Sequence, residues 1–223
     1  MCGRYVIDLP VDVMREMFDA TLIDNDLPET RNWNVCPTVR VPAIALEDGE
    51  RRLTSFRWGL IPRWYAKPTG GPLLINARAE GIAEKPAFRD AIRERRCLVP
   101  ATGFYEWTKD DEGNRLPWYV TRADGAPMVF GGLWQPWEKG EETVRSAAIV
   151  TVEAGPDVAA IHHRQPLLLN PDEWPLWLGE EGKGAATLMR PSPEGTMQAH
   201  RVGTEVNSNR AAGEGLIAPI NPA

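Results

Sequence analysis

The sequence is poor in cysteine and histidine, with three of each among its 223 residues. Cys2, Cys36 and Cys97 are odd in number and widely spaced, which argues against a disulfide framework. Because no Cys-x-x-Cys pair accompanies the few histidines, we expect no metal site.

Long apolar runs and a secretory signal are also missing. The mean hydropathy is −0.35, and the apolar runs are far shorter than the roughly 20 residues that a transmembrane helix needs. The first residues, MCGRYVIDLP, carry an acid at Asp8 and no apolar segment behind a basic start. We therefore expect a cytoplasmic protein with no membrane partner.

Apolar and turn-forming residues are plentiful. Hydrophobic residues make up 43% of the chain and include nine tryptophans, enough for a sizeable core, which excludes intrinsic disorder. Twenty prolines and twenty glycines divide the chain into short elements. Since neither a repeat nor a low-complexity linker is present, we predict one domain spanning residues 1–223.

The hydrophobic pattern predicts an α+β fold with few helices. Helices are expected at Val11–Phe18 and Pro86–Arg96, with shorter ones at Pro156–Ala160 and Pro171–Leu178. Lys109–Asn114 is predicted to be a hairpin loop with its glycine at positive φ. Strands are predicted at Arg40–Leu46, Leu53–Trp58, Cys97–Val99, Gly103–Trp107, Trp118–Thr121, Met128–Leu133, Ser146–Val152 and Leu167–Leu169. Many short strands favour a mostly antiparallel, barrel-like sheet with flanking helices.

The charge is unevenly distributed along the chain. The formal net charge of −6 is unusual for a nucleic-acid binder, whose affinity depends on neutralising phosphates. Residues 51–96, however, carry eleven basic against four acidic residues, and residues 101–223 carry ten against seventeen. This asymmetry fits either a solvated helix face near Arg89–Arg96 or a basic groove on an otherwise acidic protein.

Cys2 directly follows Met1, and aminopeptidases remove an initiator methionine when the next side chain is small. The mature chain would then begin with an α-amine of pKa about 8 and a thiol of pKa about 8.5 on one residue. Towards an aldehyde, this amine forms an imine, the thiolate adds to it, and a thiazolidine ring closes. A second-position cysteine can also be accidental, but Gly3 permits close backbone approach and Arg4 could hold an anion beside the thiol.

Three further motifs combine polar groups suited to catalysis or phosphate binding. In INARAE, Asn76, Arg78 and Glu80 share one face if the segment is a strand, although an edge strand facing solvent gives the same pattern. In GFYEW, Glu106 lies between aromatic residues, where a carboxylate has a raised pKa suited to proton transfer, unless it points outwards. In IHHRQP, a histidine and Arg164 could serve proton transfer and phosphate binding, or they could be surface loop residues.

The segment WGLIPRW places aromatic rings beside Arg63 and Lys67, a mixture that stacks on unpaired bases and holds their backbone. Burial in the core is the alternative, and it fits Trp58 better than Trp64. Cys36 and Cys97 sit in apolar surroundings, so we expect both to be buried and structural.

Taken together, MCGRY, NWNVCPT, WGLIPRW, INARAE, RRCLVPATGFYEW and IHHRQP closely resemble the SOS-response-associated peptidase (SRAP) family over nearly the whole chain, to VNSNR at Val206–Arg210. Members of that family sense abasic sites in single-stranded DNA and cross-link to them through the N-terminal cysteine. The family name records an older proposal of autoproteolysis.

The resemblance implies a role for each matching residue. Cys2 would be the nucleophile, Asn76 would position the deoxyribose and the N-terminal amine, Glu106 would be the acid/base, and His162 would move protons at the sugar. Arg78 and Arg164 would hold phosphates, with Arg4 a weaker candidate, and from its aromatic character we expect Trp64 to stack on a base next to the lesion. No metal or organic cofactor is required, and weak lyase activity follows if the imine persists.

The partner implied by the resemblance is single-stranded DNA containing abasic sites, and the expected protein is a monomer that associates with the nucleoid when bound to DNA. One departure is Gln165, where the family usually has methionine, so the local packing there differs.

Two other functions remain open from the residues alone. A cysteine hydrolase would use Cys2, His162 and Glu106 as nucleophile, base and orienting group. A passive single-strand or modified-base binding module would use the basic groove without covalent chemistry.

Overall fold

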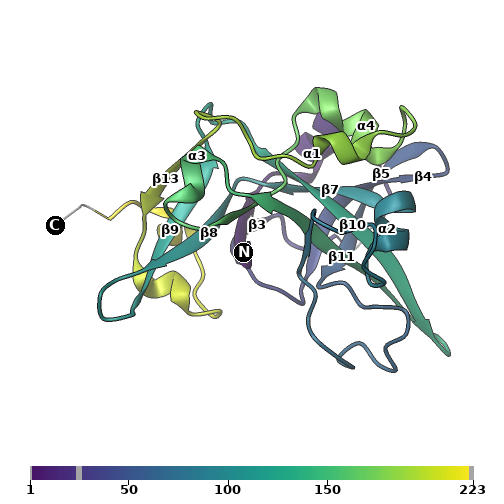
Figure 1. Cartoon of the computed structure of the whole chain (residues 1–223), viewed down its shortest axis with the longest axis horizontal. Helices are drawn as coiled ribbons and strands as arrows, with labels where there is room; N and C mark the ends of the chain where they lie inside the picture. Colours follow the sequence, from purple (N-terminus) through teal and green to yellow (C-terminus); the bar gives the residue numbers. More distant parts are fainter. Residues whose placement is uncertain (1, 24–26, 221–223) are drawn as a thin grey trace.

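Two β-sheets form the framework of the computed structural model, which describes residues 2–23 and 27–220 (Figure 1). The larger sheet contains β2 (Thr21–Leu22), β4 (Arg40–Glu47), β5 (Glu50–Trp58), β6 (Asn76–Arg78), β7 (Arg96–Ala101), β10 (Met128–Lys139), β11 (Glu142–Glu153) and β12 (Arg164–Pro166). The smaller sheet contains β1 (Tyr5–Asp8), β3 (Arg31–Val35), β8 (Gly103–Lys109), β9 (Arg115–Arg122) and β13 (Met197–Arg201).

The larger sheet closes on itself. Its strands run in the order β11-β10-β7-β4-β5, with antiparallel pairing throughout. β5 then pairs with β11 in parallel, through Arg57 opposite Ser146 and Trp58 opposite Ala147. These two pairs complete a five-stranded barrel. The predicted α+β fold with a mostly antiparallel, barrel-like sheet is therefore confirmed.

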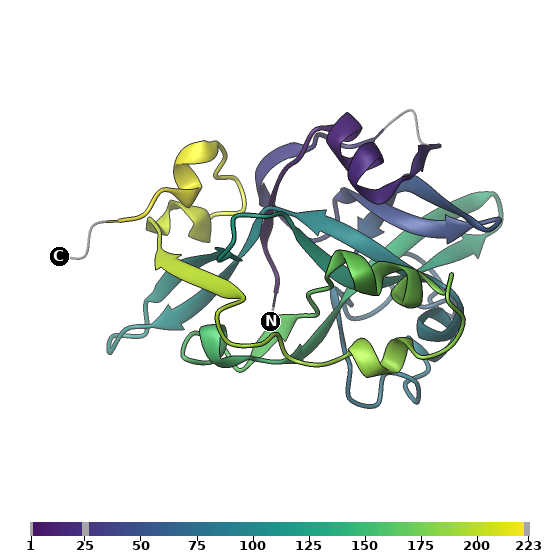
Figure 2. The same ribbon diagram turned by 90° about the horizontal axis from the view of Figure 1, so that it is seen from above.

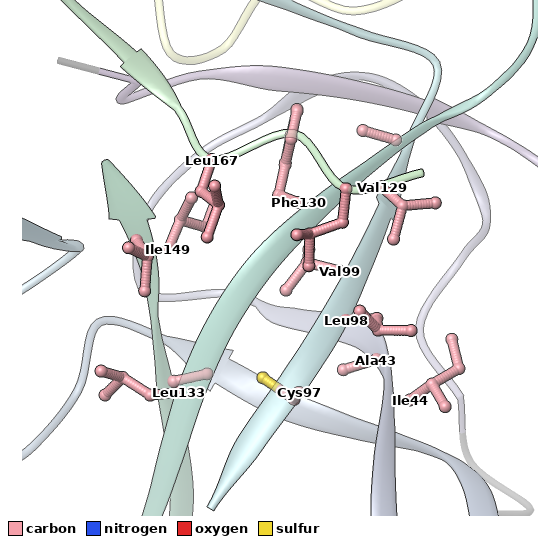
Figure 3. Packing of buried hydrophobic residues seen from close by; sticks show 14 of the residues in the cluster. Ala43, Ile44, Cys97, Leu98, Val99, Val129, Phe130, Leu133, Ile149 and Leu167 are labelled. Atoms are coloured by element: carbon pink, nitrogen blue, oxygen red, sulfur yellow. The ribbon is translucent and has the colours of Figure 1, made fainter. Parts of the chain in front are cut away.

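The main core fills the barrel and the space between the sheets. Figure 3 shows side chains of β4, β7, β10 and β11 packed together, with Cys97 among them. Cys97 is fully buried, as expected of a small structural residue. The expected burial of Cys36 was wrong, because its side chain is only half-buried; its Sγ lies near the backbone oxygens of Asn34 and Asn209.

Helices cover the outside of the sheets. They are α1 (Val11–Phe18), α2 (Arg89–Glu94), α3 (Pro156–Ala159), α4 (Trp174–Leu178) and the 3-10 helices η1 (Pro171–Glu173), η2 (Ala185–Leu188), η3 (Thr204–Asn207) and η4 (Glu214–Ile217). α1 has its predicted bounds and buries Met14 and Phe18. In contrast, α2 is shorter than predicted, because residues 86–88 form a turn before it and the chain enters β7 at Arg96. Within the described ranges, no helix is long and apolar enough to cross a membrane.

One predicted strand does not form in the structure. Arg164–Pro166 pairs with β11, whereas Leu167–Leu169, predicted as a strand, makes only an isolated bridge between Leu168 and Phe130. The predicted hairpin loop is confirmed: β8 ends at Lys109, β9 begins at Arg115, and Gly113 between them has φ +86°. Besides β12, the strands β1, β2, β3, β6 and β13 were not predicted.

β1 lies in the middle of the molecule, where both views place the purple N-terminal strand (Figures 1 and 2). Its side chains alternate, with Tyr5 and Ile7 in the main core and Val6 in a second core formed with residues of the C-terminal segment, among them Val202 and Val206. Packing on both faces fixes β1, and hence the direction in which the chain leaves it towards Cys2.

Candidate active site

Cys2 lies just before β1 and is fully buried in the chain that still carries Met1. β1 pairs with β8 through Tyr5 opposite Phe104, and the Tyr105 N–H donates to the Arg4 carbonyl at 2.9 Å. Continued in this antiparallel direction, the chain before Tyr5 runs along β8 towards Glu106.

Asn76 approaches Cys2 from the barrel. β6 pairs in parallel with β11, so Asn76 and Arg78 share one face while Ala77 is buried on the other. The Asn76 Nδ2 donates to the Cys2 carbonyl at 2.8 Å. Its Oδ1 is buried and has no hydrogen-bond partner among the described residues. A buried amide oxygen without a partner is costly, which suits a group that receives a ligand.

Glu106 is the buried carboxylate of the site. It lies on β8 opposite Trp118 and is only 5% exposed, so its side chain does not point into solvent. Burial raises the pKa of the Cys2 thiol, and the Glu106 charge raises it further, while a hydrogen bond from the Arg4 backbone opposes both. Cys2 is therefore a neutral thiol near pH 7, beside a carboxylate.

His162 enters the site from the turn between α3 and β12. Its backbone N–H donates to the Val158 carbonyl, and its Nδ1 accepts the Arg164 N–H at 2.9 Å. Burial lowers the pKa of His162, while the Glu106 charge acts in the opposite direction. The ring is therefore neutral near pH 7, and because its Nδ1 also lies 3.1 Å from the Arg164 carbonyl, the Arg164 backbone holds the ring in place in either tautomer.

Four segments far apart in the sequence thus converge, bringing together a thiol, an amide, a carboxylate and a neutral imidazole at Cys2, Asn76, Glu106 and His162. The Glu106 charge acts on both Cys2 and His162, which places the three within electrostatic reach. This set can activate a nucleophile and move protons. The described part of the chain contains no cluster of His, Cys, Asp and Glu side chains that could hold a metal ion.

The expected phosphate-binding residues lie in different environments. Arg78, at the end of β6, is exposed. Arg164, the first residue of β12, has a side chain only 7% exposed, and its guanidinium forms an ion pair with Glu80. The sequence singled out Glu80 only as part of its motif, without a role.

Trp64 lies on a loop whose two ends meet beside the site. A bridge between Leu60 and Leu74 closes this loop, so its base lies two residues from Asn76. Trp64 is 59% exposed, whereas Trp58 is buried, as the sequence favoured. The loop is held to the barrel by side chains that motif reasoning missed: Gln135 donates to the Ile61 carbonyl, Ser146 accepts from the Ile61 N–H, and Trp137 donates to the Tyr65 carbonyl.

Arg4 is not on the surface. It is 6% exposed, and its guanidinium donates to the Asn34 side chain at 2.6 Å, to the Val206 carbonyl at 3.0 Å and to the Asn209 side chain. These bonds tie the N-terminal segment to β3 and to the C-terminal segment. The geometry supports a structural role for Arg4 rather than a contact with DNA.

The basic excess of residues 51–96 is only partly available at the surface. Four of its arginines form ion pairs with carboxylates: Arg51 with Glu180, Arg52 with Glu50, Arg89 with Asp90 and Arg95 with Glu94. The exposed cations nearest the site in the sequence are Arg63, Lys67 and Arg78. A small basic rim fits the structure better than a continuous basic groove.

The family model for SOS response associated peptidase (SRAP) matches residues 1–209. The chain belongs to the SRAP family. Abasic site processing protein YoaM of Bacillus subtilis is 34% identical over 215 residues, which cover 93% of each chain. Abasic site processing protein YedK of Escherichia coli is 31% identical, covering 99% of this chain and 100% of its own.

The SRAP fold is also seen in a crystal structure of a protein from Bacteroides thetaiotaomicron. It superimposes with a TM-score of 0.86 at 24% identity and covers 99% of this chain. The barrel and the small sheet that position Cys2 are therefore features of the SRAP fold. Gln165, where the resemblance led us to expect methionine, is fully buried and satisfied: its Oε1 accepts the Gly155 N–H at 2.6 Å and its Nε2 donates to Ser192 at 2.9 Å.

Proposed function

We propose that this SRAP protein senses abasic sites in single-stranded DNA and captures them covalently through Cys2 once Met1 has been removed. The convergence of Asn76, Glu106 and His162 on Cys2 carries the proposal, because a 1,2-aminothiol with proton-transfer groups around it matches the chemistry of an aldehyde. The printed names of the relatives YoaM and YedK agree with this substrate.

The first step is opening of the sugar. An abasic deoxyribose exists mostly as a closed hemiacetal, and its aldehyde must be released before it reacts. His162, neutral near pH 7, is suited to take the proton from the anomeric hydroxyl and, as the imidazolium so formed, to give a proton to the ring oxygen.

Imine formation comes next. The α-amine of Cys2 attacks the aldehyde carbon, and one water leaves as the C=N bond forms. Glu106 takes a proton from the attacking amine and returns one to the departing hydroxyl. Asn76, already bound to the Cys2 carbonyl through Nδ2, holds the amine in line, and its unpaired Oδ1 can accept a hydrogen bond from a sugar hydroxyl.

Ring closure completes the capture. The Cys2 sulfur adds to the imine carbon, the new C–S bond closes the thiazolidine, and the thiol proton ends on the nitrogen. Because the pKa of the Cys2 thiol is raised, this step needs a base to remove that proton, and Glu106 is the carboxylate whose charge acts on the thiol. If the sulfur does not add, the imine allows β-elimination, which accounts for weak lyase activity.

DNA is held by few contacts. Arg78 and Arg164 would neutralise phosphates beside the lesion, and Trp64 would stack on a neighbouring base. With so few neutralised phosphates, non-covalent affinity is modest and depends weakly on salt. We further propose that the protein acts as a monomer in the cytoplasm, and that any peptidase activity serves the removal of Met1.

Denaturing electrophoresis after incubation with abasic single-stranded DNA tests the proposal. We expect a stoichiometric, denaturation-resistant adduct with Met1-free protein. An oligonucleotide with a tetrahydrofuran analogue, which has no aldehyde, is the matched control and should give none. An adduct formed equally well by Cys2→Ala protein would show that another residue is the nucleophile.

A further inference from the structure

Glu80 pairs with Arg164, one of the two arginines proposed to hold a DNA phosphate. Its Oε1 and Oε2 accept hydrogen bonds from Nη1 and Nη2 of Arg164 at 2.8 and 2.9 Å. This two-point pairing of a carboxylate with a guanidinium is the geometry with which arginine also binds phosphate.

The two partners differ in how firmly they are held. Arg164 is nearly buried, belongs to β12, and gives a third hydrogen bond from Nη2 to the Thr151 carbonyl at 2.6 Å. The Glu80 side chain is 57% exposed and lies beyond the end of β6, next to Gly81 at φ +69°. Glu80 can therefore turn into solvent while Arg164 stays in place.

Two further observations mark this point as a place for an anion. The Nε of Arg164 is buried and has no hydrogen-bond partner among the described residues, so the guanidinium has a donor that Glu80 leaves unused. Glu80 also feels the charge of Arg78, and hydrogen bonding from Arg164 holds its pKa below the usual range. A charged carboxylate is thus within electrostatic reach of both arginines expected to bind phosphates.

We propose that Glu80 occupies the place of a DNA phosphate on Arg164 and thereby sets the selectivity of the protein for damaged over intact strands. The inference deepens the proposed function and rests on it. Every strand must displace Glu80 to reach Arg164, so binding to intact DNA is weakened and the protein dissociates readily. At an abasic site, the covalent bond makes this weak binding sufficient.

Glu80→Gln tests the role, since it removes the competing charge and keeps the size of the side chain. Glu84→Gln is the matched control, because it makes the same charge change on the same turn without a hydrogen bond to Arg164. Binding to undamaged single-stranded DNA is measured over a range of salt concentrations, with melting temperatures to verify folding.

We expect Glu80→Gln to bind undamaged DNA more tightly, with the slope of log K against log salt steeper by about 0.7, the value for one additional phosphate on a single strand. With saturating abasic DNA alone, its cross-linking should be no slower than that of the unchanged protein. With a large excess of undamaged competitor DNA, Glu80→Gln should cross-link more slowly than the unchanged protein, because more of it is held on intact strands. Glu84→Gln should show none of these changes.

Unchanged affinity and slope for Glu80→Gln would overturn the inference, as would an equal effect of Glu84→Gln. Slower cross-linking without competitor would overturn it as well, because Glu80 would then act by holding Arg164 and His162 in position. If the unchanged protein forms no adduct at all, the proposed function fails, whereas the salt dependence still decides whether Glu80 competes with phosphate.

Discussion

Replacing Arg4 with methionine separates a structural arginine from one that binds DNA. The change keeps the aliphatic length but removes the guanidinium that bonds Asn34, Val206 and Asn209. A hydrogen bond to a charged group contributes about 1.5–3 kcal/mol, and the three are coupled and not additive. We therefore expect the free energy of unfolding to fall by about 3 kcal/mol, which lowers the melting temperature of a chain of this size by about 6–12 °C.

Thermal unfolding and salt-dependent binding to undamaged single-stranded DNA form the assay, with Arg78→Met as the control. Arg78 is exposed and makes no ion pair among the described residues, so its loss should change stability by at most about 0.5 kcal/mol. It should, however, reduce the salt slope by about 0.7. If instead Arg4→Met melts normally and shows the reduced slope, Arg4 contacts a phosphate and its structural assignment is wrong.

Three further changes test separate parts of the structure. Cys97→Ala should lower stability by about 1 kcal/mol in a melt, because it empties part of the core, and the yield of cross-linked protein should not change. Gln165→Met should destabilise by about 1–3 kcal/mol, since it leaves the Gly155 N–H and the Ser192 hydroxyl without their buried partner; urea unfolding measures this, and equal stability would contradict it. Because burial lowers the pKa of His162 below 6.5, its contribution to stability is present above that pH and is lost as the pH falls. In urea unfolding at two pH values, the free energy of unfolding should fall less on acidification for His162→Gln than for the unchanged protein.

Much of the fold follows from local patterns. The helix Val11–Phe18 and the strands of the barrel are visible as apolar periodicity between turn residues. Closure of the barrel is not, because it depends on two parallel pairs between Arg57–Trp58 and Ser146–Ala147, which are distant in sequence. β3 (RNWNV) and β13 (MQAHR) alternate polar and apolar residues, but each is five residues long with only two apolar side chains, so the pattern is too short to stand out. The apolar run Leu167–Leu169 was predicted as a strand because burial alone does not reveal pairing.

The candidate site could be predicted in its residue types but not in its contacts. Motifs identify Arg4 as a cation beside the nucleophile and Arg164 as a cation beside a histidine, yet their burial and their partners come from segments far away in the chain. Arg4 is bound by Asn209, over two hundred residues distant, and Arg164 by Glu80. Ion pairs of this kind depend on tertiary packing, so net charge over a segment overestimates the charge available to a ligand.

The Cys2 chemistry is tested most directly by measuring the mass of the adduct, before and after borohydride treatment, for Met1-free and for Met1-retaining protein. Met1-free protein should give protein plus abasic oligonucleotide minus one water, and borohydride should leave this mass unchanged, because a thiazolidine has no C=N bond to reduce. Met1-retaining protein should give no adduct, since an amide nitrogen cannot form the imine. An adduct from Met1-retaining protein at the same rate, or an adduct that gains two hydrogens with borohydride, would contradict thiazolidine formation at Cys2.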